Sequence, residues 1–456
     1  MAEFEAAGEE VELDEARVDA IRAAVDRRDS GEVSRLLEPL HAADIADLLE
    51  QISGAERREL LALWSGEIDG DVLSELDETI REEVIESLPP EVVAEAVRDL
   101  DTDDVVDILE DLEAPAQGKI LDALELVDRV AVEQAMSFPE GSAGRLMQRE
   151  VVVAPEHWTV GDAIDFLRKA KQLPDQFYHV ILVDPRMKPL GYVTLGRMLS
   201  ARRDVRLKDI AEESFRTVRA TEEEEEVAYI FNQYHLISCP VVDENDRLVG
   251  VITIDDAMNV LDEEHEEDML RLAGVGEEAS VLDGPIATVR QRLPWLVVNL
   301  FTASLSALVI SRFEATIAAL VALAAVMPIV ASTGGIAGTQ SLAVAVRALA
   351  TRDLTSSNAK RVVLREVIAG AINGVVLALI LGAVGTLVLG DPWLGLVLAL
   401  AMITNQIVAA FGGVMVPLTL ERFGLDPALA SGTFVTTLTD VMGYLAFLGL
   451  ATVVLL

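Results

Sequence analysis

A single carboxylate, Asp440, lies inside the last long apolar run of the chain, which extends over residues 428–456. Four threonines closely precede it, at positions 433, 436, 437 and 439. A charged side chain at the centre of a bilayer costs about 3 kcal/mol on insertion scales, so such residues usually face a bundle interior or a water-filled path. Two interpretations follow: a cation site in a pore, which we favour, and a hydrogen-bonded structural aspartate near a helix end.

The charge of the chain is distributed very unevenly along its 456 residues, a length sufficient for two or three domains. Residues up to Arg290 include 70 acidic and 28 basic side chains, whereas the remainder has 7 acidic and 8 basic ones. We therefore expect an acidic soluble region followed by a membrane region. The acidity excludes nucleic acid as a partner and suits cation binding. A salt-rich habitat is an alternative contributor, because only 6 lysines accompany 77 acidic residues.

The cysteine content and the first residues agree with a soluble part in the cytosol. Cys239 is the only cysteine, so no intrachain disulfide is possible. The first thirty residues are acidic and lack the apolar core of a signal peptide. The membrane spans are therefore expected to act as internal insertion signals.

The first soluble domain is predicted from a repeat. Residues 1–39 are expected to form an acidic leader with one amphipathic helix, at about 14–28. An apolar residue then recurs every 12 positions from Leu40 to Leu124, and an apolar pair follows most of these residues eight and nine positions later. A 12-residue unit fits a turn plus two helical turns, which cannot bury an apolar face alone. The units must stack, so residues 40–140 are predicted to form an all-α helical solenoid of either hand.

From about Leu146 short strand-like runs alternate with helical patterns in two similar units. Residues 190–194 (LGYVT) and 248–253 (LVGVIT) each close a βαββα pattern. Residues 141–262 thus resemble an α/β tandem of cystathionine-β-synthase-type (CBS) domains. Paired CBS units commonly hold the ribose of an adenine nucleotide with a Thr and an Asp three residues later. The resemblance implies one such ATP site at most, since the second unit has Thr253 and Asp256 whereas the first has Arg197 after Thr194.

An acidic helix is predicted at 255–272, and it overlaps the connecting (plug) helix assigned to 263–292. Its carboxylates repel one another at helical spacing, so the helix is either a solvated face or one stabilised by cations against another acidic surface. Oxygen ligands suit Mg²⁺ or Ca²⁺ better than zinc, and we expect His235 and His265 to be ordinary surface residues. The candidate cation ligands of the soluble region are Asp103, Asp104, Asp107, Glu223, Glu225, Glu226, Asp256, Glu264, Glu267 and Asp268.

Five apolar runs, at about 293–310, 315–346, 367–389, 393–420 and 428–456, are each long enough to span a bilayer. The connection 347–365 carries five basic residues, which places it and the N-terminal region in the cytosol and the C-terminus outside. The second run contains Pro328, Gly334, Gly335 and Gly338. These residues suggest a broken helix whose freed carbonyls line a water-filled path. Close helix packing is the alternative.

The order of helical repeat, CBS pair, acidic connecting helix and five spans resembles the MgtE family of magnesium channels and transporters. The strongest motif matches are Phe313-Glu314, Pro328, Gly334-Gly335-x-x-Gly338-x-Gln340, the stretch 347–350 and the stretch 426–441. The resemblance implies a homodimer, Asp440 at the ion site of the pore, and Mg²⁺ bound among the cytosolic domains to close the pore. The pore-lining candidates are Glu314, Gly334, Gly335, Gly338, Gln340, Thr436 and Thr437.

The sequence thus predicts a multi-domain protein of the cell (inner or plasma) membrane, with a five-helix transmembrane bundle at 293–456 that conducts Mg²⁺. Neither a nucleophile–base pair nor a P-loop is recognisable, so we expect no enzyme and no ATP-driven pump. Three alternatives stay open. The chain is a membrane-anchored adenine-nucleotide sensor, or an exporter or exchanger of divalent cations, or it carries Mn²⁺ or Co²⁺ in place of Mg²⁺.

Overall fold

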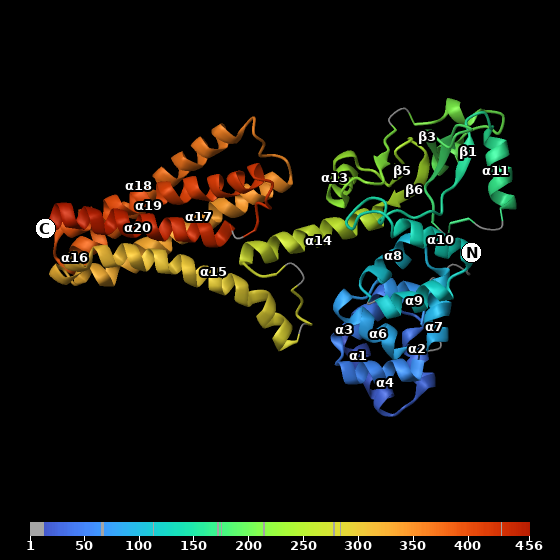
Figure 1. The fold of residues 1–456 in the computed structure, drawn as a ribbon, viewed down its shortest axis with the longest axis horizontal. Helices are drawn as coiled ribbons and strands as arrows, with labels where there is room; N and C mark the ends of the chain where they lie inside the picture. Colours follow the sequence, from blue (N-terminus) through green and yellow to red (C-terminus); the bar gives the residue numbers. More distant parts are fainter. Residues whose placement is uncertain are drawn as a thin grey trace, which may run out of the picture. The chain divides into compact units, whose positions relative to one another are not determined.

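The computed structural model describes residues 13–64, 68–112, 114–170, 173–174, 176–212, 215–276, 279–282, 284–429 and 431–456. The chain divides into two compact units, Met1–Glu264 and His265–Leu456 (Figure 1). The first unit contains a helical domain and two small sheets with their helices. The second contains the long apolar helices.

The helical domain stacks short helices around one apolar core. They are α1 Glu15–Asp26, α2 Ser30–Leu37, α3 Ala42–Gln51, α4 Gly54–Trp64, α5 Gly70–Ser74, α6 Glu78–Ser87, α7 Pro90–Ala96, α8 Thr102–Glu110, α9 Ala114–Ala123 and α10 Leu126–Ala135, with a 3₁₀ turn at Val97–Asp99. The residues of the 12-residue repeat are buried or partly buried in this core, which confirms the stacked helical repeat.

The 12-residue unit has a simple local cause. An apolar residue enters the core, and the next residue is the N-cap of the following helix, as at Leu40-His41, Leu76-Asp77 and Leu100-Asp101. The Asp77 carboxylate accepts a hydrogen bond from the Thr79 backbone N–H at 2.8 Å, which satisfies one of the free donors at the start of α6. Each unit therefore restarts its helix one residue after it has buried its apolar side chain.

The expected acidic leader differs from the structure over its described part, residues 13–39. The predicted helix at 14–28 is present as α1, but α2 follows it directly. Val18 and Ile21 of α1 and Val33 and Leu37 of α2 are buried in the same core as the repeat. These two helices therefore belong to the helical domain, because their apolar faces are buried nowhere else; residues 1–12 lie outside the described residues.

The two CBS-like units have the same topology, and each contains a three-stranded sheet. The first sheet is formed by β1 Val153–Pro155, β2 His179–Val183 and β3 Pro189–Thr194, and the second by β4 Val218–Arg219, β5 Ser238–Val242 and β6 Leu248–Thr253. In each sheet the first pair of strands is parallel and the second antiparallel. The helices are α11 Val160–Lys169, α12 Leu195–Ser200 and α13 Glu224–Tyr234. The tandem α/β architecture is as predicted.

The acidic helix α14 extends over Ile254–Ala273, close to its predicted bounds. The connecting segment 263–292 is not one helix. Gly274 has a φ of +71°, a left-handed conformation that ends helices and favours glycine. A new helix, α15, begins at Pro285, where a missing backbone N–H costs nothing.

The second unit contains five helices that are long and apolar enough to cross a membrane, counted over the described residues. They are α15 Pro285–Arg312, α17 Ala322–Ala350, α18 Ala359–Leu389, α19 Pro392–Arg422 and α20 Ser431–Leu455 (Figure 1). A short helix, α16 Glu314–Ala319, precedes α17. Of the long helices, α19 is the most buried, and it packs against α17, α18 and α20.

The broken helix predicted around the glycines of the second span is wrong. α17 is continuous through Pro328, Gly334 and Gly338, and the interruption lies earlier, between α16 and α17. The glycines serve close packing. A Cβ added at Gly338 would lie 2.6 Å from Val435 Cγ1 of α20, closer than side chains can approach. Local sequence does not separate these two uses of glycine, since both need the missing side chain.

Candidate functional site

Asp440 lies in the middle of α20 and is half-buried. The neighbouring Thr439 is fully buried against the glycine face of α17. The hydroxyl groups of Thr436, Thr437 and Thr439 donate to carbonyl oxygens of their own helix at 2.7–2.9 Å. The hydroxyl oxygens of the half-buried Thr436 and Thr437 keep lone pairs that can accept hydrogen bonds from the water of a hydrated cation.

The Asp440 carboxylate has no hydrogen bond or ion pair among the described residues of the chain. A structural aspartate in an apolar helix needs such partners, since an unpaired buried carboxylate is strongly disfavoured. The alternative of a hydrogen-bonded structural Asp440 therefore has no support in its contacts. A carboxylate without partners in a membrane helix is instead available to a cation or to a second copy of the chain.

The other pore-lining candidates occupy different environments. Gly334 and Gly338 are buried in helix contacts, and Gly335 is half-buried near Thr436. Gln340 and Glu314 are exposed. Glu314 is the first residue of α16, which is joined to α20 by a 2.8 Å hydrogen bond between the Thr316 and Thr452 hydroxyl groups.

Within the first compact unit, an acidic cluster lies where the helical domain meets the second CBS-like unit. Asp103 and Asp104 lie in the first turn of α8, and Asp256 lies near the start of α14. Burial, reinforced by the charge of Asp256, raises the pKa of Asp104 to about 7 and raises the pKa of Asp103 as well. Burial also raises the pKa of Asp256 to about 6, although the Thr253 hydroxyl donates to its carboxylate at 2.7 Å. The ionised forms of these carboxyl groups are therefore unfavourable in the folded protein, and a bound cation would offset this cost.

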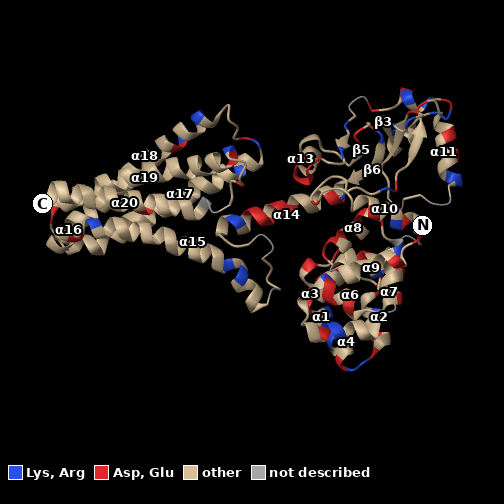
Figure 2. Ribbon diagram, in the orientation of Figure 1, with Lys and Arg blue, Asp and Glu red and all other residues tan. Residues whose placement is uncertain are grey.

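The remaining candidate ligands are more dispersed. Asp107 forms an ion pair with the buried Arg81 at 2.9 Å, and Glu267 forms one with Arg271 at 2.7 Å. Three others begin α13, namely Glu223 at its N-cap and then Glu225 and Glu226, while Glu264 and Asp268 lie along α14 (Figure 2). Over the described residues, no group of three acidic, histidine or cysteine side chains is arranged to hold a metal ion.

The last turn of α14 is attached to the membrane helices within the second unit. The Arg271 guanidinium lies 2.8 Å from the Asp426 carboxylate, in the connection that leads into α20. Leu272 packs against an apolar cluster that contains Leu342 of α17 and Val435 of α20. The end of α14 is therefore in direct contact with α20, the helix that carries Asp440, and with the connection that leads into it.

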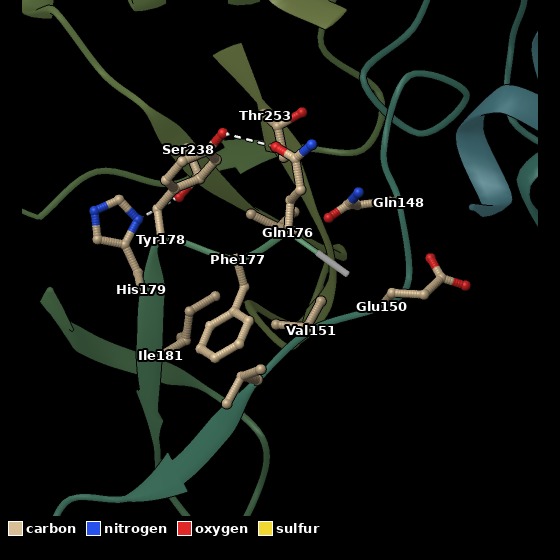
Figure 3. A pocket seen from close by; sticks show the side chains of 12 residues that line it. Gln148, Glu150, Val151, Gln176, Phe177, Tyr178, His179, Ile181, Ser238 and Thr253 are labelled. Carbon is tan, nitrogen blue, oxygen red and sulfur yellow. Dashed lines mark hydrogen bonds between the residues drawn. The ribbon is translucent and has the colours of Figure 1, made fainter. Parts of the chain in front are cut away.

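A small pocket opens between the two CBS-like units (Figure 3). Its lining includes Phe177, Tyr178 and His179 of the first CBS-like unit and Ser238 and Thr253 of the second CBS-like unit. The His179 ring nitrogen Nδ1 and the Ser238 hydroxyl are hydrogen-bonded, and burial lowers the pKa of His179. Of the two residues expected at a nucleotide site, Thr253 lines this pocket, whereas Asp256 is not among its lining residues.

The pocket residues other than Thr253 were not foreseen from the sequence, although a signal exists. His179 and Ser238 are the polar first residues of two otherwise apolar strands, β2 and β5. In the two sheets they pair with equivalent threonines, His179 with Thr194 and Ser238 with Thr253. A polar residue at the start of each buried strand marks this position in both units.

Three family models match the chain, one of them twice. Residues 327–450 match the model MgtE, described as a divalent cation transporter. Residues 40–141 match the MgtE intracellular N domain, and residues 143–204 and 207–263 each match the CBS domain.

Known proteins similar to this chain include the magnesium transporter MgtE of Thermus thermophilus, 35% identical over 337 residues, which are 73% of this chain and 74% of that protein. The magnesium transporter MgtE of Bacillus subtilis is 31% identical over 330 residues, or 72% and 73% of the two chains. Among solved structures, the cytosolic domain of the Mg²⁺ channel MgtE in complex with ATP matches with 30% identity and a TM-score of 0.50. It covers 53% of this chain and 99% of that one.

Proposed function

Because the chain belongs to the MgtE family of magnesium transporters, we propose that it moves Mg²⁺ across the cell membrane past Asp440. The observation that carries this proposal is the Asp440 carboxylate, which lies inside an apolar helix without a hydrogen bond or ion pair among the described residues. A lone carboxylate in a membrane segment usually belongs to an ion path.

In the proposed mechanism two copies of the chain form a homodimer and their Asp440 side chains face one path. Mg²⁺ gives up its water reluctantly, so the ion stays largely hydrated and the two carboxylates accept hydrogen bonds from its water molecules. The Thr436 and Thr437 hydroxyl oxygens and the exposed Gln340 and Glu314 are proposed to line the same path. A membrane potential of 100 mV supplies about 4.6 kcal/mol for an ion with two charges, which is sufficient without ATP hydrolysis.

The glycines Gly334, Gly335 and Gly338 act in this scheme by letting α17 and α20 approach closely, which brings their polar groups to the path. The basic connection between α17 and α18 is proposed to face the cytosol, together with the N-terminal region, and the C-terminus to face outside.

We propose that cytosolic Mg²⁺ regulates this path through the acidic cluster. Mg²⁺ would bind Asp103, Asp104 and Asp256 most readily, because their burial makes the cation-free ionised state unfavourable. Glu223, Glu225 and Glu226 of α13, and Glu264, Glu267 and Asp268 of α14, would complete further weak sites together with Asp107. Ligands shift a conformational balance only by their differential affinity for the two states, so several weak sites acting together give a steep response. The Arg271–Asp426 contact would carry the change to α20.

An adenine nucleotide, ATP, is proposed to bind the pocket between the CBS-like units, with the Thr253 hydroxyl as one of its partners. The pocket has the mixture of aromatic and polar side chains that nucleoside sites use. The nucleotide would act as a regulator rather than as a substrate, and we propose transport rather than a catalysed reaction as the function of the chain.

Purified full-length protein in liposomes tests the transport proposal. Mg²⁺ entry that grows with an imposed inside-negative potential, without an ion gradient in the opposite direction, is the result expected of a channel. Entry that requires a counter-ion on the other side, and ignores the potential, would indicate an exchanger instead. No Mg²⁺ entry in either case would refute the proposal.

A further inference from the structure

Asn405 is a fully buried amide in the middle of the membrane unit. It lies on α19, the helix that packs against α17, α18 and α20, and none of its surface is exposed. Its Nδ2 group donates a 2.8 Å hydrogen bond to the Val330 carbonyl oxygen of α17, 75 residues away. This bond fixes the level of α19 along α17.

The amide is enclosed by two glycines from different helices. A Cβ added at Gly443 of α20 would lie 2.8 Å from Asn405 Nδ2 and 3.1 Å from its Cγ. A Cβ added at Gly334 of α17 would be closer still to the same two atoms. The side chain of Asn405 therefore fills a space that both helices leave by having no side chain, so it contacts α17 and α20 at once.

The second amide atom shows that this contact is not explained by stability alone. Within the described part of the chain, Asn405 Oδ1 is buried and has no hydrogen-bond partner. A buried acceptor without a partner is destabilising, whereas an aliphatic side chain of similar size would avoid the penalty. A polar group kept at such a position is suited to fixing one arrangement of the helices against others of similar packing energy.

On α20, Asp440 lies between two residues that contact the neighbouring helices, Thr439 and Gly443. Thr439, directly before it, packs toward Gly335 and Gly338 of α17. Gly443 follows Asp440 by three residues, slightly less than one helical turn, and rests on Asn405. The rotation and the level of α20 at Asp440 are therefore determined by the threonine on one side and by the amide of Asn405 on the other.

We propose that Asn405 is a positioning residue of the cation path, which sets the register of α20 against α17 and thereby the level of Asp440. This inference rests on the proposed function of Asp440 as the ion-binding carboxylate. A slip of α20 by one helical turn would move Asp440 along the path by about 5.4 Å, more than the length of a hydrogen bond.

The experiment compares Asn405→Leu with Gln406→Met in full-length protein. Gln406 is the matched control, because it is also buried on α19 and donates to a carbonyl oxygen of α17, that of Thr333, at 3.3 Å. Its side chain, however, lies beside Gly374 of α18, whereas the Asn405 amide lies beside Gly443 of α20. Both substitutions replace an amide by an apolar side chain of similar size. The two variants therefore differ mainly in the helix that the substituted side chain faces.

The first readout is the register itself. A disulfide between cysteines introduced at Gly335 and Thr436 reports the α17–α20 register, since a Cβ at Gly335 would lie 3.9 Å from Thr436 Cγ2. A Cys239→Ser background removes the native thiol. We expect the cross-link to form in the parent and in Gln406→Met, and to be reduced at least threefold in Asn405→Leu.

The second readout is Mg²⁺ flux into liposomes, measured without the introduced cysteines. The Mg²⁺ concentration for half-maximal flux should rise about threefold to tenfold in Asn405→Leu, because a displaced Asp440 carboxylate loses about one hydrogen bond to the hydrated ion. Gln406→Met should keep the value of the parent. A rise in this concentration, with unchanged dimer content, is not produced by a merely structural loss of active protein.

Equal cross-linking in the two variants, or a lost cross-link with unchanged flux, would overturn the proposal. This outcome is distinguishable from failure of the proposed function. If the proposed function is wrong, Asp440→Ala leaves the Mg²⁺ flux intact, whatever the cross-link shows. Should Asn405→Leu not assemble, Gly443→Ala presses on the same amide from α20. Its control is Gly449→Ala, whose added Cβ meets nothing within 4 Å, and equal flux in these two variants would likewise refute the inference.

Discussion

Replacing Asp104 by Asn is expected to stabilise the helical domain above about pH 7 when divalent cations are absent. Burial, followed by the charges of Asp256 and Asp101, raises the pKa of Asp104 from 3.8 to about 7. Each pKa unit corresponds to about 1.4 kcal/mol. The ionised carboxylate therefore costs the folded state at most about 4 kcal/mol, an upper limit because its neighbours titrate with it.

The sign of the pH dependence follows from the direction of the shift. Because the folded pKa of Asp104 is higher than the unfolded one, the folded domain keeps a proton that the unfolded chain has lost between about pH 4 and pH 7. The corresponding stability is complete below this window and is lost as the pH rises through the folded pKa. Mg²⁺ should consequently stabilise the wild-type domain most above about pH 7, where the carboxylates can ionise and bind it.

Hydrogen exchange of the α8 amides in the full-length protein measures this effect. We expect Asp104→Asn to slow exchange at high pH without Mg²⁺ and to remove the further protection that Mg²⁺ gives the wild type. Asp19→Asn is the control, since it removes an exposed charge from α1 of the same domain. Equal effects of the two substitutions, or equal protection of the wild type by NaCl at the same ionic strength, would refute the strained cation-binding cluster.

Two other parts of the soluble region give sharp tests. Arg81→Met leaves the half-buried Asp111 without its 2.5 Å ion pair and should destabilise the helical domain by about 3–5 kcal/mol. Arg58→Met, which removes an exposed ion pair, should cost less than about 1 kcal/mol. Chemical denaturation, monitored by hydrogen exchange, compares the free energies of unfolding of the two variants. Thr253→Ala should weaken ATP binding by about tenfold, the loss of one hydrogen bond, whereas Thr194→Ala should not. Calorimetry on the full chain decides, and equal losses would refute the single site.

The repeats and the strands were predictable because their causes are local. An apolar residue every 12 positions, followed at once by a capping residue, determines both the burial and the start of each helix. The inclusion of α1 and α2 in the same core was not foreseen. Their acidic composition hid the apolar faces formed by Val18, Ile21, Val33 and Leu37.

Only the part of the candidate site that depends on a single residue was predictable from the sequence. Asp440 stands out because it is the one charge in a long apolar run. The role of the α17 glycines stayed open between a broken helix and close packing, because the contacts that decide it come from Asn405 and Val435, which are far away in the sequence. The pocket likewise needs His179 and Ser238 to meet across the two CBS-like units, and the polar first residues of β2 and β5 do not by themselves predict that contact.

Mg²⁺ flux through Asp440→Ala, in liposomes with an imposed potential, tests the central claim most directly. Asp391→Asn is the matched control, because it removes an acidic charge from the same unit while retaining an N-cap side chain for α19. We predict that Asp440→Ala assembles like the wild type yet conducts no more than protein-free liposomes, that Asp440→Asn is strongly impaired, and that Asp391→Asn conducts normally. Wild-type flux through Asp440→Ala would contradict the account.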